Sequence, residues 1–137
     1  MERLMIESYI TQYGWTYQLP ENAPDTVITG LELSNGTPIL LVFQLQSSWL
    51  RISAPAFSPM PEGDDWATFA ETLLMLAGQS RLVKFAIDGA RNLFLCVDIF
   101  TEPSLPYDQF ALALDVLAHY TEATHQTLTL AGAQNPV

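Results

Sequence analysis

The chain has 137 residues, 49% of them hydrophobic and 11% aromatic, which suits one folded domain with its own core and argues against disorder. Fifteen acidic residues against five basic ones give a formal net charge of -10, which disfavours binding to nucleic acid and to anionic membrane surfaces. The single cysteine, Cys96, excludes an internal disulfide and a cysteine-based zinc site.

The first predicted elements are a helix and a β-hairpin. Apolar residues recur at helical spacing over residues 2–13, and Gly14 is a suitable end for that helix. Apolar and polar residues then alternate over 27–33 and again over 38–45, as they do in strands. The Asn-Gly pair at 35–36 tolerates the positive φ that a type I′ turn requires at both central positions, so it predicts a tight hairpin.

A third strand and a second helix are expected next. Residues 49–54 alternate again, which extends the hairpin into an antiparallel meander. Residues 55–63 contain three prolines and a glycine and are predicted to form a loop. Asp64 or Asp65 is a natural N-cap for the amphipathic helix that follows, and Gly78 is expected to end it.

The C-terminal part predicts a second hairpin and a long helix. A strand is expected over 82–87, followed by an Asp-Gly turn at 88–89 and a strand over 93–100. Pro106 suits the first turn of a helix, and apolar residues then recur at helical spacing over 107–118.

The order of these elements favours the α+β class, because the strands come in antiparallel groups instead of alternating singly with helices. The predicted fold is an antiparallel sheet with the order α-β-β-β-α-β-β-α. We expect one domain over residues 1–130 and a loose tail over 131–137. The first residues lack the pattern of a signal peptide, and no apolar run is long enough to span a bilayer, so we expect a cytoplasmic protein.

This order of elements resembles the fold of type III secretion chaperones and of the YbjN-like family of bacterial proteins. The closest local likeness lies in segment 76–88, where a helix ends and a strand containing Lys84 and Phe85 leads to an acidic turn. Gln79 departs from this pattern, because the YbjN-like proteins often have Asn there. Segment 95–99 also fits, as do four residues of the last predicted helix and its start: Pro106, Phe110, Ala113 and Leu117.

The resemblance implies binding rather than catalysis. Type III secretion chaperones are commonly dimers that bind an extended segment of a secreted protein, and some YbjN-like proteins are linked to stress or motility regulation. Neither family brings catalytic residues or a cofactor. The resemblance therefore implies a homodimer, with an extended segment of another protein as a further partner.

Apolar residues on the second face of the predicted sheet are the strongest candidates for a binding surface. Leu40, Val42, Trp49 and Phe94 all fall opposite the strand positions expected to face the core. A sheet with one solvated face should alternate apolar and polar residues more cleanly. Two interpretations stay open: helices cover parts of both faces, or this face is a dimer or partner surface.

Three of the five basic residues cluster in the second predicted hairpin. Arg81, Lys84 and Arg91 either form a solvated hairpin whose charges prevent edge pairing, or a small patch for an acidic ligand or partner.

The sequence contains no recognisable catalytic or metal-binding motif. The glycines form neither a phosphate-binding loop nor a nucleophile elbow, and Cys96 has no neighbouring base in the sequence. Glu122 and His125 have the Glu-x-x-His spacing of half a di-iron site, but no second such pair exists and His119 points elsewhere on a helix. We therefore predict no cofactor and a polar helix face at these residues.

These observations favour a non-enzymatic protein-binding module, chaperone-like or a regulatory adaptor. The alternative is a small-ligand-binding protein or an enzyme whose site is assembled from scattered residues, which the sequence does not reveal.

Overall fold

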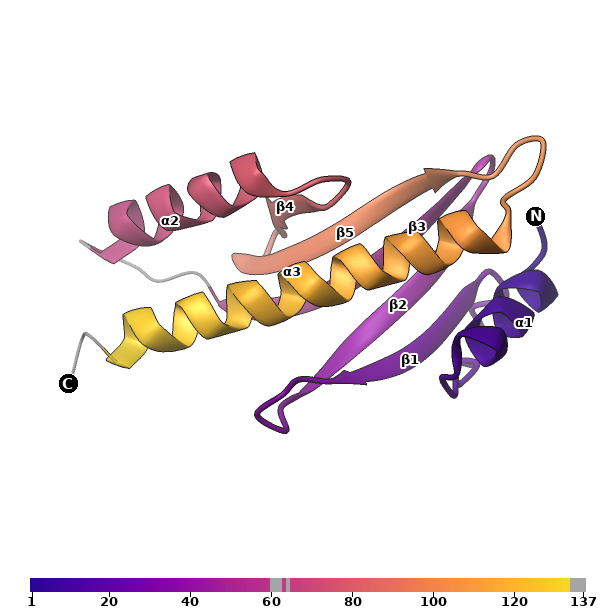
Figure 1. Cartoon of the computed structure of the whole chain (residues 1–137), viewed down its shortest axis with the longest axis horizontal. Helices are drawn as coiled ribbons and strands as arrows, with labels where there is room; N and C mark the ends of the chain where they lie inside the picture. Colours follow the sequence, from indigo (N-terminus) through magenta and orange to yellow (C-terminus); the bar gives the residue numbers. More distant parts are fainter. Residues whose placement is uncertain (60–62, 64, 134–137) are drawn as a thin grey trace.

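A computed structural model describes residues 1–59, 63 and 65–133, with the backbone alone for 56–59 and 128–133 (Figure 1). It shows an α+β fold, as predicted, with the eight elements in the predicted order: α1 (Arg3–Tyr13), β1 (Thr26–Glu32), β2 (Pro38–Gln46), β3 (Trp49–Pro59), α2 (Asp65–Gln79), β4 (Lys84–Ile87), β5 (Asn92–Phe100) and α3 (Tyr107–Ala133).

The strands form one antiparallel sheet in the order β1-β2-β3-β5-β4. The two hairpins that the sequence predicts, β1-β2 and β4-β5, are joined through the pairing of β3 with β5. This long-range pairing places β1 and β4 at the two edges, with α2 inserted in the sequence between β3 and β4.

The first hairpin forms where it was predicted, but its turn differs. Gly36 has a φ of 89° and is the only residue of the Asn-Gly pair in the left-handed region. The Gly36 amide donates to the Leu33 carbonyl at 2.9 Å, which closes a four-residue turn over 33–36. The predicted type I′ turn is therefore wrong: the left-handed conformation occurs only at Gly36, the last residue of the turn, and this turn also reverses the chain between the two strands.

The third strand is longer than predicted. It runs to Pro59, so residues 55–59 belong to a strand and not to the expected loop, while 60–62 and 64 lie outside the described residues. The register with β5 shifts between Ala54 and Ser58, which marks a β-bulge. Prolines are compatible with a strand at such an irregularity. Beyond the bulge, Ser58 and Pro59 pair with Leu93 and Asn92 of β5.

Three other boundaries differ by a few residues. The helix α2 ends at Gln79, one residue beyond Gly78. The strand β4 starts at Lys84 instead of at residue 82, because Leu82 has a φ of 72° and is not extended. The helix α3 runs to Ala133, so residues 131–133 of the expected tail are helical and 134–137 lie outside the described residues.

One face of the sheet forms the hydrophobic core with residues from all three helices. In Figure 1, α3 crosses in front of the sheet. Phe110 of α3 is fully buried, and its ring lies 5.8 Å from that of Phe43 on β2 and 5.3 Å from that of Tyr9 on α1. Helix residues of the same cluster are Ile6, Ile10, Leu73, Leu114 and Leu117, and sheet residues include Val27, Leu41, Ile52, Leu95 and Val97.

Candidate functional site

The four residues proposed as a binding face lie on the same side of the sheet, opposite the core. Leu40 and Val42 are on β2, Trp49 is on β3 and Phe94 is on β5. The register pairs core residue Phe43 with core residue Ile52, so neighbouring Val42 and its partner Ser53 point to the other face. Leu40 and Trp49 are each about half exposed, at 49% and 48%, and Val42 and Phe94 are half-buried. We call this side the open face.

Side chains on the open face form rows that run across the strands. One row pairs Trp49 with the half-exposed Phe100, and the two rings lie 5.1 Å apart. The next row contains Arg51 and Asp98. A third row runs from Ile28 to Lys84 through all five strands, and Leu40 and Phe94 each lie two residues before its members on β2 and β5, Val42 and Cys96. Exposed aromatic and aliphatic groups therefore lie on both sides of a charged centre.

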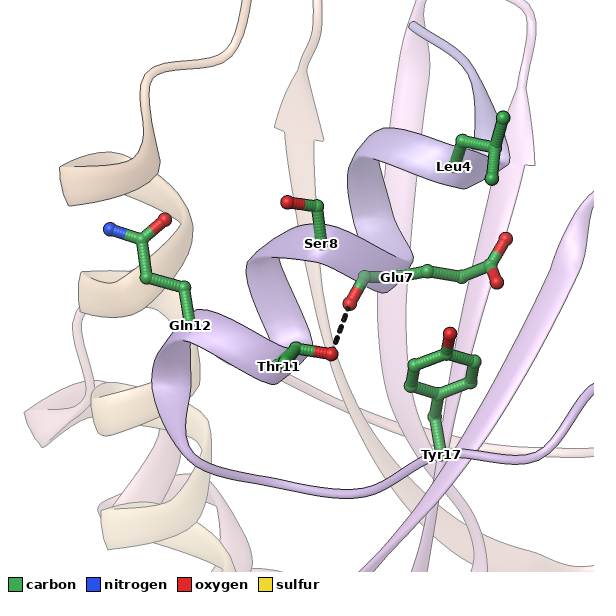
Figure 2. A pocket seen from close by; sticks show the side chains of 6 residues that line it. All are labelled: Leu4, Glu7, Ser8, Thr11, Gln12 and Tyr17. Atoms are coloured by element: carbon green, nitrogen blue, oxygen red, sulfur yellow. Dashed lines mark hydrogen bonds between the residues drawn. The ribbon is translucent and has the colours of Figure 1, made fainter.

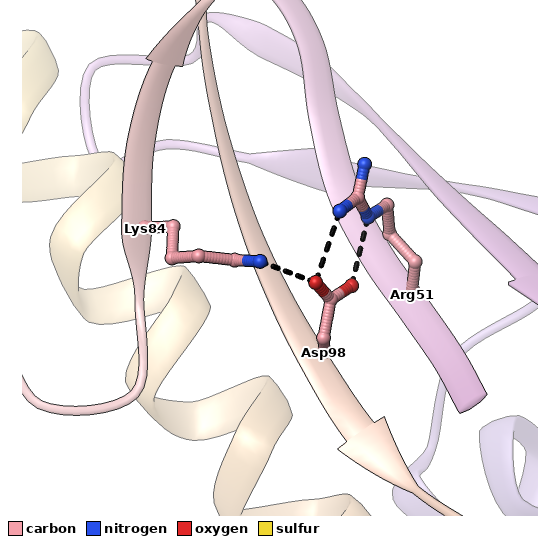
Figure 3. A network of polar contacts seen from close by, with 3 residues as sticks. All are labelled: Arg51, Lys84 and Asp98. Atoms are coloured by element: carbon pink, nitrogen blue, oxygen red, sulfur yellow. Dashed lines mark hydrogen bonds and ion pairs between the residues drawn. The ribbon is translucent and has the colours of Figure 1, made fainter. Parts of the chain in front are cut away.

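The charged centre is an ion-paired triad from three strands (Figure 3). The Arg51 guanidinium donates from Nε to Asp98 Oδ1 at 2.7 Å and from Nη2 to Asp98 Oδ2 at 2.9 Å. Lys84 also donates from Nζ to Asp98 Oδ2. The hydrogen bond from Arg51, together with that from Lys84, lowers the pKa of Asp98 to about 2, although its partial burial opposes this shift. The carboxylate is thus charged at neutral pH.

Two small residues complete the middle of the open face. Ser53 and Cys96 are buried, although they point away from the core. Both lie in the row that ends at Lys84, where neighbouring side chains are larger. Burial raises the pKa of the Cys96 thiol, which disfavours the thiolate that nucleophilic chemistry requires. Cys96 is thus a buried free thiol.

The three basic residues proposed as an anion patch lie at separate places around β4. Lys84 is within the strand and faces Asp98. Arg81 precedes β4, whereas Arg91 lies in the turn that follows it, so the two are at opposite ends of the strand. Only Lys84 belongs to the open face, and its cationic neighbour there is Arg51, which the sequence did not single out because the pairing of β3 with β5 is not local.

The Glu-x-x-His pair of α3 contacts the first hairpin. Glu122 accepts hydrogen bonds from the Ser34 amide at 3.2 Å and from the Ser34 hydroxyl. The Asn35 side chain and His125 Nε2 lie 3.1 Å apart. No group of three or more potential metal-binding side chains occurs in the part of the chain that the structure describes. Glu122 and His125 thus connect α3 to the turn of the first hairpin.

A hollow of about 480 Å³ lies beside α1 (Figure 2). Glu7 is nine-tenths buried there, with its Oε2 atom 3.5 Å from Arg3 Nε. The Tyr17 hydroxyl points toward this carboxylate, and a hydrogen bond to Glu7 raises the pKa of Tyr17. The Thr11 hydroxyl is used within the helix, where it donates to the Glu7 carbonyl at 3.0 Å. The hollow offers one carboxylate that is already paired and no histidine or cysteine.

A second hollow, of about 240 Å³, lies between α2 and the edge strand β4. Its lining side chains are all apolar, and Trp66, Leu74 and Ile87 are exposed there. The helix α2 also exposes Met75. The protein therefore has an apolar groove beside one edge of the sheet in addition to the open face.

Comparison with solved structures finds a match over almost the whole chain. The crystal structure of YbjN from E. coli, described as a proposed transcription regulator, superposes with a TM-score of 0.65 and covers 90% of both chains. The chain has a YbjN-like fold. The sequence identity is 12%, so this YbjN-like likeness shows the fold alone. No protein-family model and no curated protein matches the sequence.

The YbjN-like fold confirms the resemblance inferred from the order of the elements. Within the described residues, no helix is both long enough and apolar enough to cross a membrane.

Proposed function

We propose that this YbjN-like protein is a non-enzymatic protein-binding module, a chaperone-like or regulatory adaptor that binds through the open face of its sheet. One observation carries the proposal: Leu40, Trp49 and Phe100 remain about half exposed on the face opposite the helices. Half-exposed aromatic and aliphatic side chains grouped on one face are typical of surfaces that bind another protein.

Charge favours a protein partner over nucleic acid. YbjN from E. coli, whose structure is similar, is described as a proposed transcription regulator. A regulator can act by contacting DNA or by contacting other proteins, and a net charge of -10 opposes the first mode. We therefore place any regulatory role of this chain in contacts with proteins.

Two occupants fit the open face, and both belong to the proposal. A second copy would bury the apolar rows of two sheets against each other in a homodimer. An extended segment of another protein would lay its side chains across the same rows. The two occupants differ in a property that can be measured, because only the first makes the isolated protein dimeric.

The test combines sedimentation with affinity capture. Analytical ultracentrifugation at micromolar concentration measures self-association of the purified native protein. Capture from the lysate of its own cells, read by mass spectrometry, measures other partners. The key variant is Leu40→Asp/Val42→Asp, which places two charges on the open face and removes either kind of contact.

A matched variant makes the result specific. Leu74→Asp/Met75→Asp adds the same charges on exposed residues of α2, away from the open face. We expect dimer or partner to be lost with the first double variant and kept with the second. Loss only with the α2 variant would move the interaction to the groove between α2 and β4. A native protein that is monomeric and captures nothing would refute the proposal.

A further inference from the structure

The open face contains a hollow of about 450 Å³ whose walls combine cations with apolar groups. It lies between the ends of β2 and β3 and the residues that precede β4. Its lining residues are Gln46, Trp49, Arg51, Leu82, Lys84 and Asp98.

The charge of this hollow is opposite to that of the whole protein. Arg51, Lys84 and Asp98 together carry one net positive charge, whereas the chain carries a net charge of -10. Two of the five basic residues of the chain are therefore concentrated in one hollow of the open face. A carboxylate would be attracted at this place and repelled by most of the remaining surface.

Both cations retain hydrogen-bond donors that can face a ligand. Arg51 uses Nε and Nη2 for Asp98, and Figure 3 shows its third nitrogen directed away from that carboxylate. No hydrogen bond from this third nitrogen, Nη1, occurs within the described part of the chain. The Lys84 side chain is 55% exposed and has three N–H donors, of which Asp98 takes one. Asp98 thus holds the Arg51 and Lys84 side chains in place and leaves each of them with N–H groups that can donate to a ligand.

The apolar walls show what must accompany the carboxylate. Trp49 presents an exposed ring on one side, next to Phe100. Leu82 is 60% exposed on the other side, in a left-handed conformation that is unfavourable for a leucine. The next residue, Val83, is buried in the core, so the chain direction at Leu82 turns one side chain inward and the other toward the hollow.

We propose that this hollow recognises an acidic side chain flanked by an apolar or aromatic one, in an extended segment of a partner protein. This inference rests on the proposed function, because it assigns the partner that the open face binds. Arg51 and Lys84 donate to the carboxylate, while Trp49 and Leu82 contact the flanking apolar side chain. A second copy fits less well, since a twofold axis through the hollow would place two positively charged triads against each other.

The experiment selects ligands from a displayed library of short random-sequence peptides on the immobilised native protein. We expect enriched peptides to carry Asp or Glu within two positions of an apolar or aromatic residue. The most enriched peptide is then measured by calorimetry against its Asp→Asn or Glu→Gln version. We expect the neutral peptide to bind at least about tenfold more weakly, since charge-assisted hydrogen bonds are lost.

Variants of the protein locate the site. Arg51→Met and Lys84→Met should each weaken binding of the acidic peptide at least about fivefold, while the affinity for the neutral peptide should change little. The matched control is Arg91→Met, which removes the same charge at the far end of β4 and should leave affinity within about twofold. Of the two variants, Lys84→Met is expected to disturb folding less, because Lys84 is more exposed than Arg51. Circular dichroism checks that both variants are folded.

Several outcomes would overturn this inference. These are a library that yields no enrichment, enriched peptides without acidic residues, or equal losses with Arg91→Met. Equal binding of free acetate and the peptide would indicate a small-anion site instead, and a native dimer disrupted by Arg51→Met would assign the hollow to a second copy. A partner captured through Leu40 and Val42 without any acidic preference would retain the proposed function and reject only this inference.

Discussion

The two faces of the sheet are made from the same strands, yet they differ in what covers them. On the core face, Phe43 and Ile52 are fully buried beneath the helices. On the other face, Leu40 and Trp49 lie on the same two strands and remain about half exposed. Apolar composition alone does not distinguish these positions. The position of the helices does, and it leaves one apolar face for another molecule.

The polar groups differ between the faces as well. On the core face, Phe110 packs against the aromatic rings of Phe43 and Tyr9. The open face has an ion-paired triad at its centre. A charged centre between apolar rows resists non-specific association and makes binding depend on the charge of the partner. Substitutions on each face test this difference, and the largest effect is expected in the core.

The first prediction compares the same substitution on the two faces. Phe110→Ala should reduce the free energy of unfolding by about 3–5 kcal/mol, because it leaves a cavity in the core. Phe100→Ala should cost about 1 kcal/mol or less, because this ring is half exposed and lies beside the equally exposed Trp49. Urea denaturation of the monomer measures both values. Similar costs at the two positions would mean that the open face is covered in the isolated chain.

The second prediction concerns the triad. Asp98 has a folded pKa of about 2, below its ordinary value near 3.8, so the stabilisation is present above about pH 4 and is lost as the pH falls toward 2. Asp98→Asn should cost about 1–2 kcal/mol at pH 7, less than the full shift implies because Lys84 is largely in solvent. The difference in the free energy of unfolding between the native protein and Asp98→Asn should shrink below pH 4.

A matched variant isolates the triad from the loss of charge. Asp25→Asn removes one exposed carboxylate elsewhere and should change the free energy of unfolding little at any pH. Urea denaturation at pH 7, 5 and 3 measures all three proteins. A difference for Asp98→Asn that stays constant down to pH 3 would contradict the assigned ion pairs.

The third prediction is the smallest and concerns the contact between the first hairpin and α3. Glu122→Gln should speed amide exchange at Ser34 and Gly36, because Glu122 accepts from both donor groups of Ser34. The contact with Ser34 lowers the pKa of Glu122, so the protection of these amides relative to intrinsic exchange at each pH should be lost only on acidification below the ordinary range of a glutamate. Unchanged exchange in the variant, measured by NMR, would show that the hairpin does not depend on α3.

Much of the fold could be predicted because its signals are local. Alternation over 27–33 and 38–45 indicated two strands, and Gly14 marked the end of the first helix, where it adopts a φ of 99°. The order of elements was sufficient to suggest a YbjN-like fold. Segment 55–59 was wrongly predicted as a loop because its prolines are local signals, whereas its pairing with β5 past a bulge is not.

The candidate site was only partly predictable for the same reason. Leu40, Val42, Trp49 and Phe94 were found because alternation assigns each residue to a face of its own strand. Arg51 was not found, since its importance depends on standing opposite Asp98 in a different hairpin. The basic residues Arg81 and Arg91 are close to Lys84 in sequence but lie at opposite ends of β4.

Periodicity and turn residues were enough to predict the class of the fold, the identity and order of its elements, and the apolar character of both faces of its strands. Folding in three dimensions added that the helices supply one core face, that β3 pairs with β5, and that Arg51 and Lys84 meet at Asp98. Contacts between distant segments depend on how packed elements share limited space, and that information is not contained in any local pattern of residues.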